Sequence, residues 1–408
     1  MANRLPIQKF NQPVAKGEPY SDRSDIIVMT DEAHRTQYGS LALNMRLALP
    51  NASYIGFTGT PLMKDDEITK KIFGGYISKY GFQRAVEDGA TLPLYYDARG
   101  EKLNVAHTEL NEKIAEKLEQ FESELSDRDV ATRLEQELKR EYHIITANDR
   151  LDAIAKDFVE HYSTRWESGK AMLVCIDKIT CARMHASIVR HWQAKTKELE
   201  KALNSAKDEQ DAVARQRQVN WMKETLAAVV VSEEQGEVAK FREWNIDITP
   251  HRRLLKEGFT LADGSRLDVE SAFKRDNHPF RIAIVCAMWL TGFDVKSLAT
   301  LYLDKPLKAH TLMQAIARAN RVKDGKENGL IVDYCGILRN LRKALATFGG
   351  HGGDEAPPPE IDPLKPETDL LAELDEAIGL VRAFLTERRV NLDDLFERGG
   401  FDRNAALV

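Results

Sequence analysis

Residues 26–34 read IIVMTDEAH, an apolar run of strand length that ends in two adjacent carboxylates. Residues 38–49 follow with apolar side chains at helical spacing, and a second apolar run at residues 54–57 leads into TGTP at residues 58–61. A strand, a helix and a strand at this spacing predict a βαβ unit of a parallel sheet. Both polar clusters then lie at the carboxyl ends of their strands, which is the edge where open α/β sheets bind ligands.

A second α/β region follows further along the chain. Its predicted strands are the apolar runs at residues 171–176, 227–231, 281–288, 299–303 and 330–332. Helices fit between these runs, so a second doubly wound parallel sheet is the simplest packing. The predicted fold class is therefore α/β, with a parallel sheet in each of two lobes.

Charge-rich and Gly/Pro-rich stretches divide the chain into five parts. Two stretches rich in Glu, Lys, Arg and Gln predict helical segments, and a Gly/Pro-rich stretch predicts a linker. The expected boundaries are a partial first lobe at 1–100, a helical insert at 101–149, a complete second lobe at 150–345 with a helical insertion at about 193–225, a linker at 346–367 and a C-terminal helical segment at 368–408. An amphipathic helix in the last part, which would dock on its own chain or on a partner, is predicted from Leu371, Leu374, Ile378, Val381 and Leu385.

The composition is that of an ordinary globular protein. The chain has 408 residues, 43% of them hydrophobic, and a formal charge of −6 from 58 basic and 64 acidic side chains. This charge gives no general argument for a polyanionic partner, so any DNA contact must be local. No stretch approaches the roughly 20 consecutive apolar residues of a membrane helix, and no signal peptide is recognisable, so we expect a cytoplasmic protein. The four cysteines lie too far apart in sequence for a zinc motif or a disulfide scaffold.

Asp31 and Glu32 have the arrangement that phosphoryl-transfer motors use. In such motors the Asp holds Mg²⁺ through its water shell and the Glu polarises the attacking water. Acidic residues are also common in the first turn of a helix, so a structural role would explain the pair as well. His34, two residues further on, is expected to link the nucleotide state to the neighbouring lobe.

Thr58, Gly59 and Thr60 place two hydroxyls and a flexible turn beside the same edge. This arrangement suits a relay of the γ-phosphate state, although any turn that ends a strand could carry these residues. Their spacing after Asp31 favours the functional interpretation.

The most specific stretches come late in the second lobe. Residues 288–295 read MWLTGFDV and follow one strand, and residues 314–321 read QAIARANR and follow the next. Gln314, Arg318 and Arg321 are spaced at i, i+4 and i+7, which predicts that they share one helical face. Such a face could be a solvated basic stripe. It also suits arginine fingers, because a planar guanidinium can stabilise charge spread over several phosphate oxygens.

In this order, the sequences DEAH, TGTP, LTGFD and QxxxRxxR resemble motifs II, III, V and VI of helicase superfamily 2. The longer wording GFTGTP at residues 56–61, AVEDGA at residues 85–90, TGFD at residues 291–294 and IVDY at residues 331–334 resembles the R subunit of type I restriction enzymes. The resemblance covers nearly the whole chain and implies RecA-like lobes. It also implies an ATP-dependent DNA translocase that uses Mg²⁺ and double-stranded DNA and assembles with methyltransferase and specificity subunits.

The resemblance also assigns roles to individual residues. Asp31 and Glu32 would bind Mg²⁺ and activate water, and His34, Thr58, Gly59 and Thr60 would couple the nucleotide state to the rest of the motor. In the second lobe, Gln314 would contribute a neutral contact. The remaining assignments are Gly292 and Asp294 as residues that contact nucleotide and couple it to DNA, and Arg318 and Arg321 as arginine fingers.

Two family features are missing from this sequence. No G-x-x-x-x-G-K-[ST] motif is found, since Gly169-Lys170 and Gly325-Lys326 both lack the upstream glycine and the hydroxyl residue. No convincing nuclease signature is found either. We therefore expect a C-terminal portion of an R subunit that is inactive without its N-terminal part. The alternatives are a non-catalytic remnant that binds DNA or a partner, and a different superfamily 2 helicase.

Overall fold

The computed structural model describes residues 10, 14, 18–31, 33, 38–58, 73–74, 77–78, 80–124, 136–234, 236–290, 292–307, 309–337, 340–342 and 364–387. Within these ranges no helix is both long enough and apolar enough to cross a membrane.

The first lobe contains the predicted βαβ unit. β1 (Ile27–Thr30) and β2 (Ser53–Gly56) pair in parallel, and α1 (Tyr38–Ala48) connects them. Met45 and Ala48 of α1 pack with other apolar residues against one face of this pair. On the opposite face the side chains of Ile27 and Met29 are 71% and 69% exposed. A parallel sheet is normally covered on both faces, and these two side chains leave one face of the described strand pair uncovered.

The second lobe is built on a seven-stranded sheet with strand order β11-β3-β10-β9-β4-β8-β5, in which every pair of neighbours is parallel. The five strands predicted for this lobe are all present. They are β4 (Lys170–Cys175), β5 (Leu226–Val230), β8 (Phe280–Val285), β9 (Leu298–Asp304) and β10 (Gly329–Asp333).

Two strands of this sheet come from outside the predicted boundaries. β3 (Leu94–Asp97) falls in the part predicted as the first lobe, but it pairs with β10. β11 (Leu364–Pro366) falls in the predicted linker and pairs with β3. The predicted second lobe of 150–345 was therefore too narrow. Both strands are short and each contains or follows a proline, so their local pattern does not show which sheet they join.

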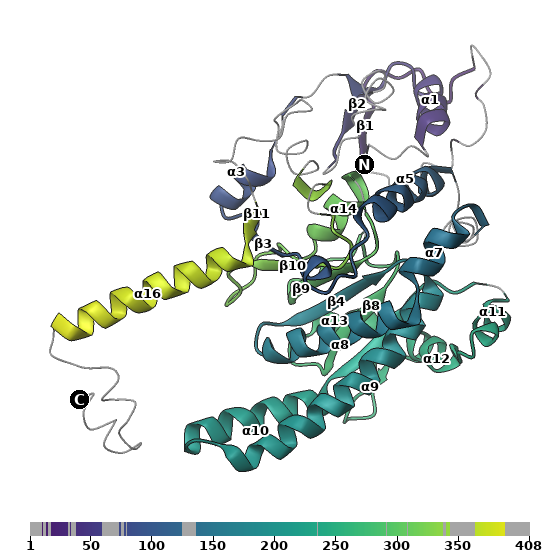
Figure 1. Cartoon of the computed structure of the whole chain (residues 1–408). Helices are drawn as coiled ribbons and strands as arrows, with labels where there is room; N and C mark the ends of the chain where they lie inside the picture. Colours follow the sequence, from purple (N-terminus) through teal and green to yellow (C-terminus); the bar gives the residue numbers. More distant parts are fainter. Residues whose placement is uncertain are drawn as a thin grey trace.

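Helices cover both faces of the large sheet (Figure 1). Neighbouring residues in a strand point to opposite faces. In β4, Met172 and Val174 belong to the core beneath α13 (Val269–Lys274) and α14 (Ala309–Ile316). Ala171, Leu173 and Cys175 belong to the core beneath α8 (Asn148–Thr164) and α9 (Lys178–Ala202). This two-sided burial explains why the strands are continuous apolar runs, and it matches the RecA-like arrangement that was expected.

The predicted insert between the lobes is helical and is anchored on the second lobe. It includes α4 (Arg99–Lys102), α5 (Thr108–Glu124) and α7 (Lys139–Ile145), and α3 (Phe82–Glu87) precedes β3. Ile114 and Leu118 of α5 pack with Tyr142 and Ile145 of α7 and with Ile176, which follows β4.

The predicted insertion at about 193–225 is the far half of a helical hairpin. α9 runs without a break to Ala202, and the short helix η2 (Leu203–Ser205) leads into α10 (Glu209–Glu224). The Trp192 indole donates a hydrogen bond to the Met222 carbonyl, 2.9 Å away, and so joins the two helices. Between β5 and β8, the chain forms α11 (Glu237–Glu243), α12 (Thr249–Glu257) and a small hairpin of β6 (Phe259–Thr260) and β7 (Arg266–Leu267), followed by α13.

The predicted C-terminal helix is present as α16 (Glu367–Glu387), which extends outward from β11 in Figure 1. The exposed fractions of Leu371, Leu374 and Val381 are 61%, 54% and 54%. The helix is therefore present where it was predicted, and in the described part of the chain these three apolar side chains are exposed to solvent.

Candidate active site

Asp31 lies immediately after β1, and Thr58 lies two residues after the end of β2. Backbone hydrogen bonds join the two loops, because the Phe57 amide donates to the Thr30 carbonyl at 2.8 Å and the Ala33 amide donates to the Phe57 carbonyl at 3.0 Å. The parallel register therefore brings Asp31 and Thr58 to the same edge of the first lobe, as the sequence predicts.

Gly56 and Ala33 make this close approach possible. A Cβ atom on Gly56 would lie only 2.9 Å from the Ala33 Cβ, a separation that real side chains do not adopt. Any larger residue at position 56 would push the Asp31 loop away from β2. The close packing of the two loops thus explains Gly56, the first glycine of GFTGTP, and Ala33, the alanine of DEAH. The predicted site residues Glu32, His34, Gly59 and Thr60 lie outside the described residues.

The stretch after β8 forms a turn supported by stacked aromatic rings. Trp289 has a φ of +68°, which is unusual for a bulky residue, and its ring stacks on Phe293 with centroids 4.2 Å apart and planes 9° apart. Gly292 is exposed with a φ of +66°, and a Cβ atom there would have no neighbour within 4 Å. Space beside Gly292 is therefore open, and its positive φ is what favours glycine at this position.

Gln314, Arg318 and Arg321 do not share one helical face, so this prediction was wrong. α14 ends at Ile316, and the backbone then tightens because the amides of Arg318 and Ala319 donate to carbonyls only three residues back. Gln314 is buried and Arg318 is only 9% exposed, whereas the Arg321 side chain is 45% exposed.

The Arg318 guanidinium is turned into the protein. Its Nε atom donates to the Leu290 carbonyl at 3.2 Å, and its Nη1 atom donates to the Phe293 carbonyl. These two carbonyls lie on either side of Thr291 and Gly292. Arg318 therefore joins the turn after α14 to the turn after β8.

Arg321 is the exposed member of the pair, and it forms an ion pair with Asp294. The Nε atom of Arg321 lies 3.5 Å from the Oδ1 atom of Asp294, and the Asp294 side chain is 59% exposed. The structure thus brings together two candidate residues that lie 27 positions apart in the sequence.

Lys326 and Gly329 support the same segment, and the sequence analysis did not identify either as a site residue. The Lys326 Nζ atom donates to the carbonyls of Ala319, at 2.6 Å, and Arg321, at 3.1 Å. A Cβ atom on Gly329 would lie 2.3 Å from the Ala319 carbonyl oxygen. Burial, with a further contribution from nearby Lys323, lowers the pKa of Lys326 to about 8. Only the fold reveals these roles, because neither residue belongs to a recognisable motif.

Buried acids end several strands of the large sheet, and local partners satisfy them. Asp304 ends β9 and accepts a hydrogen bond from Arg150 at 2.6 Å. The same guanidinium donates to the carbonyls of Val105 and Ile145, at 3.0 Å and 2.8 Å. Arg150 therefore fastens the insert to the carboxyl edge of the sheet, which is a structural role.

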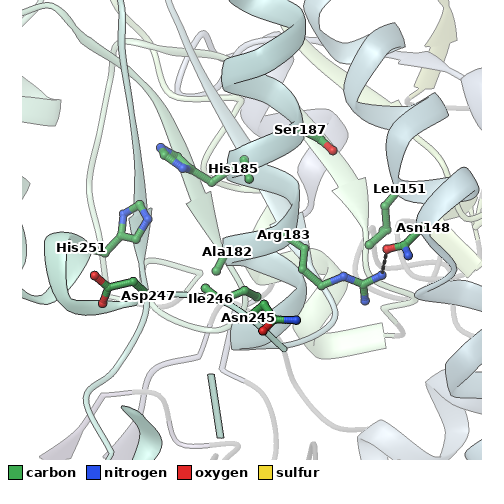
Figure 2. A pocket seen from close by; sticks show the side chains of 11 residues that line it. Asn148, Leu151, Ala182, Arg183, His185, Ser187, Asn245, Ile246, Asp247 and His251 are labelled. Carbon is green, nitrogen blue, oxygen red and sulfur yellow. Dashed lines mark hydrogen bonds between the residues drawn. The ribbon is translucent and has the colours of Figure 1, made fainter. Parts of the chain in front are cut away.

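A separate cavity of about 370 Å³ lies on the flank of the second lobe, and none of the predicted site residues lines it. Figure 2 shows the imidazoles of His185 and His251 on one side of this cavity and the bond from Arg183 to Asn148 on the other. Burial and the neighbouring His185 lower the pKa of His251 to about 4, so this ring is uncharged at neutral pH. The lining residues come from separate helices and a loop, which explains why no sequence motif pointed to them.

Two family models match this chain. Residues 5–128 match the SWI2/SNF2 ATPase model, and residues 167–336 match the model for domain 3 of the type I restriction enzyme subunit R. The first match includes the Asp31 and Thr58 loops, and the second includes Asp294, Arg318 and Arg321.

Curated relatives match most of the chain. The MjaIXP type I restriction enzyme endonuclease subunit of Methanocaldococcus jannaschii is 36% identical over 84% of this chain and 29% of its own length. The HindI type I restriction enzyme endonuclease subunit of Haemophilus influenzae is 35% identical over 85% of this chain and 30% of its own length. A solved fragment of an HsdR subunit from Vibrio vulnificus YJ016 aligns with a TM-score of 0.45 and 16% identity, covering 83% of this chain and 47% of that fragment. The chain thus spans less than a third of the length of these two curated relatives.

Proposed function

We propose, since this chain belongs to the family of type I restriction enzyme endonuclease (R) subunits, that it forms part of an ATP-driven motor that translocates DNA and feeds it to cleavage. The observation that carries the proposal is the ion pair between Asp294 and Arg321. It joins the two most specific motifs of the second lobe at one exposed place. Asp31 and Thr58 also lie at one edge of the first lobe, where backbone hydrogen bonds join their two loops.

The site residues would act on ATP and Mg²⁺. ATP supplies the phosphoryl group that passes to water, and Mg²⁺ neutralises charge on its phosphates. Carboxylate oxygens suit Mg²⁺, so Asp31 would hold the ion through water, and Glu32 would orient the attacking water. His34, Thr58, Gly59 and Thr60 would relay the γ-phosphate state. On the second lobe, Gly292 offers an uncrowded backbone and Arg321 offers an exposed guanidinium.

The wider assembly is part of the same proposal. The motor would track double-stranded DNA by local contacts, since the net charge of −6 provides no general attraction. It would act in the cytoplasm, joined to the rest of the R subunit and to the methyltransferase and specificity subunits. The uncovered side chains of Ile27 and Met29 favour this view, because further layers of the first lobe would cover them.

The test is DNA-stimulated ATP hydrolysis with and without a P-loop. The chain alone should hydrolyse ATP at background rates, because the P-loop provides most phosphate contacts. A fusion to the P-loop-containing N-terminal segment of a closely matching R subunit should hydrolyse ATP when DNA is added, and Glu32→Gln in the fusion should abolish this turnover. A folded fusion that binds ATP but never responds to DNA would favour a non-catalytic binding role. Robust turnover by the chain alone, lost in Glu32→Gln, would show that the chain does not need the added loop.

A further inference from the structure

We propose that the cavity of about 370 Å³ on the flank of the second lobe binds a mononucleotide. Arg183 would hold the phosphate, and His251 and Asp247 would hold a base that carries an amino group. This site is separate from the candidate active site, since none of the predicted site residues lines the cavity. The inference therefore does not depend on the proposed function.

The cavity has two ends with different chemistry. Figure 2 shows Arg183 and Asn148 at one end and His251 and Asp247 at the other. The lining residues come from α8, α9, the loop between α11 and α12, and α12. Small-molecule sites have volumes of roughly 300–1,000 Å³, so this cavity is larger than a single ion needs. A small ligand with two different ends can contact both ends of the cavity.

The Arg183 guanidinium forms no ion pair in the described part of the chain. Its Nη2 atom donates instead to two neutral oxygens, the Thr146 carbonyl at 2.6 Å and the Asn148 Oδ1 atom at 2.7 Å. Burial lowers the pKa of Arg183, although Tyr142 and Asp177 oppose this effect. A partly buried cation without a counter-ion is costly, and an anion in the cavity would supply one.

The same guanidinium is held in place before any ligand arrives. Besides the two bonds from Nη2, its Cζ atom lies 5.1 Å from the centroid of the Trp244 ring, which is a cation–π contact. Its Nε and Nη1 atoms form no hydrogen bond with the described residues, so these N–H groups are available to a ligand. A cation that is fixed in this way loses little conformational freedom on binding.

The other end of the cavity offers hydrogen-bond acceptors and aromatic rings. The ring centroids of His185 and His251 lie 4.5 Å apart, with their planes at 88°. Burial and the neighbouring His185 lower the pKa of His251 to about 4, and burial also lowers the pKa of His185, so both rings are uncharged at neutral pH. The exposed Asp247 carboxylate accepts a hydrogen bond from the Thr249 amide at 2.9 Å and has further acceptor capacity.

These two ends together select the class of ligand. The cation requires an anionic group, the acceptors require N–H donors, and aromatic rings favour a planar partner. A mononucleotide whose base has an exocyclic amine, such as adenosine 5′-monophosphate (AMP), meets all three requirements. An inorganic anion meets only the first, and an aliphatic amino acid lacks the planar ring. A free mononucleotide and the 5′-terminal nucleotide of a strand share this chemistry.

The experiment measures the binding of AMP to the purified chain by isothermal titration calorimetry, with inorganic phosphate and adenosine as probes of the two ends. AMP should bind at least about tenfold more tightly than either probe. Arg183→Gln should weaken AMP and phosphate by about tenfold or more, because each loses a charged hydrogen bond. His251→Ala should weaken AMP and leave phosphate unchanged. AMP that binds no more tightly than phosphate, or with full affinity to Arg183→Gln, would overturn the proposal.

Two control variants locate the site. Arg190→Gln removes an exposed arginine of α9 that pairs with Asp152 and does not line the cavity. Arg321→Ala removes a cation of the candidate active site. Both variants should bind AMP like the parent chain, which would separate the cavity from general surface charge and from the candidate active site. A loss of AMP affinity in either control as large as that in Arg183→Gln would contradict the assignment to the cavity.

A second measurement keeps the test decisive if Arg183→Gln fails to fold. In the unsubstituted chain labelled with ¹³C-histidine, AMP should shift the ring resonances of His185 and His251 most among the ten histidines, because these two rings line the cavity. The spectrum of His251→Ala identifies the His251 resonance. If AMP moves other histidines and leaves the His251 resonance in place, the proposal is wrong.

Single strands that begin with a 5′-terminal adenosine distinguish the two sources of the ligand. If the site takes a strand terminus, a 5′-phosphorylated strand should displace AMP and the same strand with a 5′-hydroxyl should not. If the site takes a free mononucleotide, neither strand should displace AMP. Equal displacement by both strands would contradict the phosphate contact of Arg183 and would overturn the proposal.

Discussion

Arg321 and Asp294 form an exposed ion pair, with 3.5 Å between Nε and Oδ1, although they come from different turns of the second lobe. The strength of this ion pair decides whether Arg321 is free to move to a nucleotide. If Arg321 is to contact a nucleotide, the pair must be weak enough to break, and exposed pairs of this kind are worth about 0.2–1 kcal/mol.

The first prediction is that Asp294 and Arg321 are only weakly coupled. A double-mutant cycle of Asp294→Ala and Arg321→Ala, measured by urea unfolding, should give a coupling free energy below about 1 kcal/mol at low salt. The coupling should vanish in about 1 M salt, where the Debye length is about 3 Å. A coupling free energy of several kcal/mol would mean that Arg321 is locked in place and unsuited to act as a finger.

The second prediction concerns the buried ion pair of Arg150 and Asp304, whose loss should lower the free energy of unfolding strongly when it is measured by urea unfolding. Arg150→Met should lower the free energy of unfolding by about 3–5 kcal/mol, because it leaves a buried carboxylate without its cation. Arg150→Met combined with Asp304→Leu should recover part of this loss, since a buried apolar pair needs no compensating charge.

Arg150 also holds the helical insert, through the carbonyls of Val105 and Ile145. Limited proteolysis of Arg150→Met should therefore cut residues 101–149 faster than in the parent chain. An insert as resistant as that of the parent would show that other contacts suffice to anchor it.

Much of the fold was predictable because buried parallel strands leave a strong local signal. The runs that became β4, β8 and β9 are covered on both faces and are therefore mostly apolar. β3 was not assigned to its sheet, because four residues carry no information on which distant strand they join. Pairing with β10, more than 200 residues away, is decided by the packing of the whole lobe.

The candidate site likewise could not be predicted fully from local sequence patterns. The spacing of Arg318 and Arg321 predicted a common helical face, but α14 ends before both residues. The spacing of residues predicts a shared helical face only where the helix continues, and tertiary contacts set the residue at which α14 ends. Gly329 packs against the Ala319 carbonyl and Lys326 bonds to it, and neither contact can be inferred from residues 314–321 alone.

The third prediction is a pH dependence that arises from Lys170. This side chain is 2% exposed, and its Nζ atom donates to the Ala272 carbonyl at 3.0 Å. Burial lowers the pKa of Lys170 from 10.5 to about 7. In the folded state the amine therefore loses its proton near pH 7, while in the unfolded state it keeps the proton to about pH 10.5. Between these values the unfolded state binds more protons, so Lys170 makes the free energy of unfolding rise with pH.

Lys170→Met removes this dependence. The stability of the variant minus that of the parent should be constant below about pH 7 and should fall above it, by at most about 1.4 kcal/mol per pH unit. Urea unfolding between pH 6 and pH 9 would measure this difference, with the exposed Lys201→Met as the matched control. A difference that does not change with pH would mean that Lys170 keeps its proton in the folded state throughout this range.

The last prediction tests the arginine finger in the P-loop-restored fusion. If Arg321 reaches the γ-phosphate, Arg321→Lys should fail almost as badly as Arg321→Ala, because lysine keeps the charge but loses the planar fork. A finger of this kind is worth roughly a thousandfold or more in turnover, and ATP affinity should change far less than kcat. Gln314→Ala should be milder than either variant, since it removes a neutral side chain.

Asp294→Asn is the matched control for this finger test, because it releases Arg321 from its ion pair while keeping the guanidinium and nearly the same side-chain volume. If the pair only holds Arg321 before nucleotide arrives, Asp294→Asn should lower kcat less than Arg321→Lys, and any loss from the expected contact of Asp294 with nucleotide should fall on the KM for ATP. DNA-stimulated hydrolysis, measured as kcat and KM for the parent fusion and the four variants, decides the matter. Parent-like kcat in both Arg321 variants would reject the finger, and would leave its exposed guanidinium as part of a solvated surface.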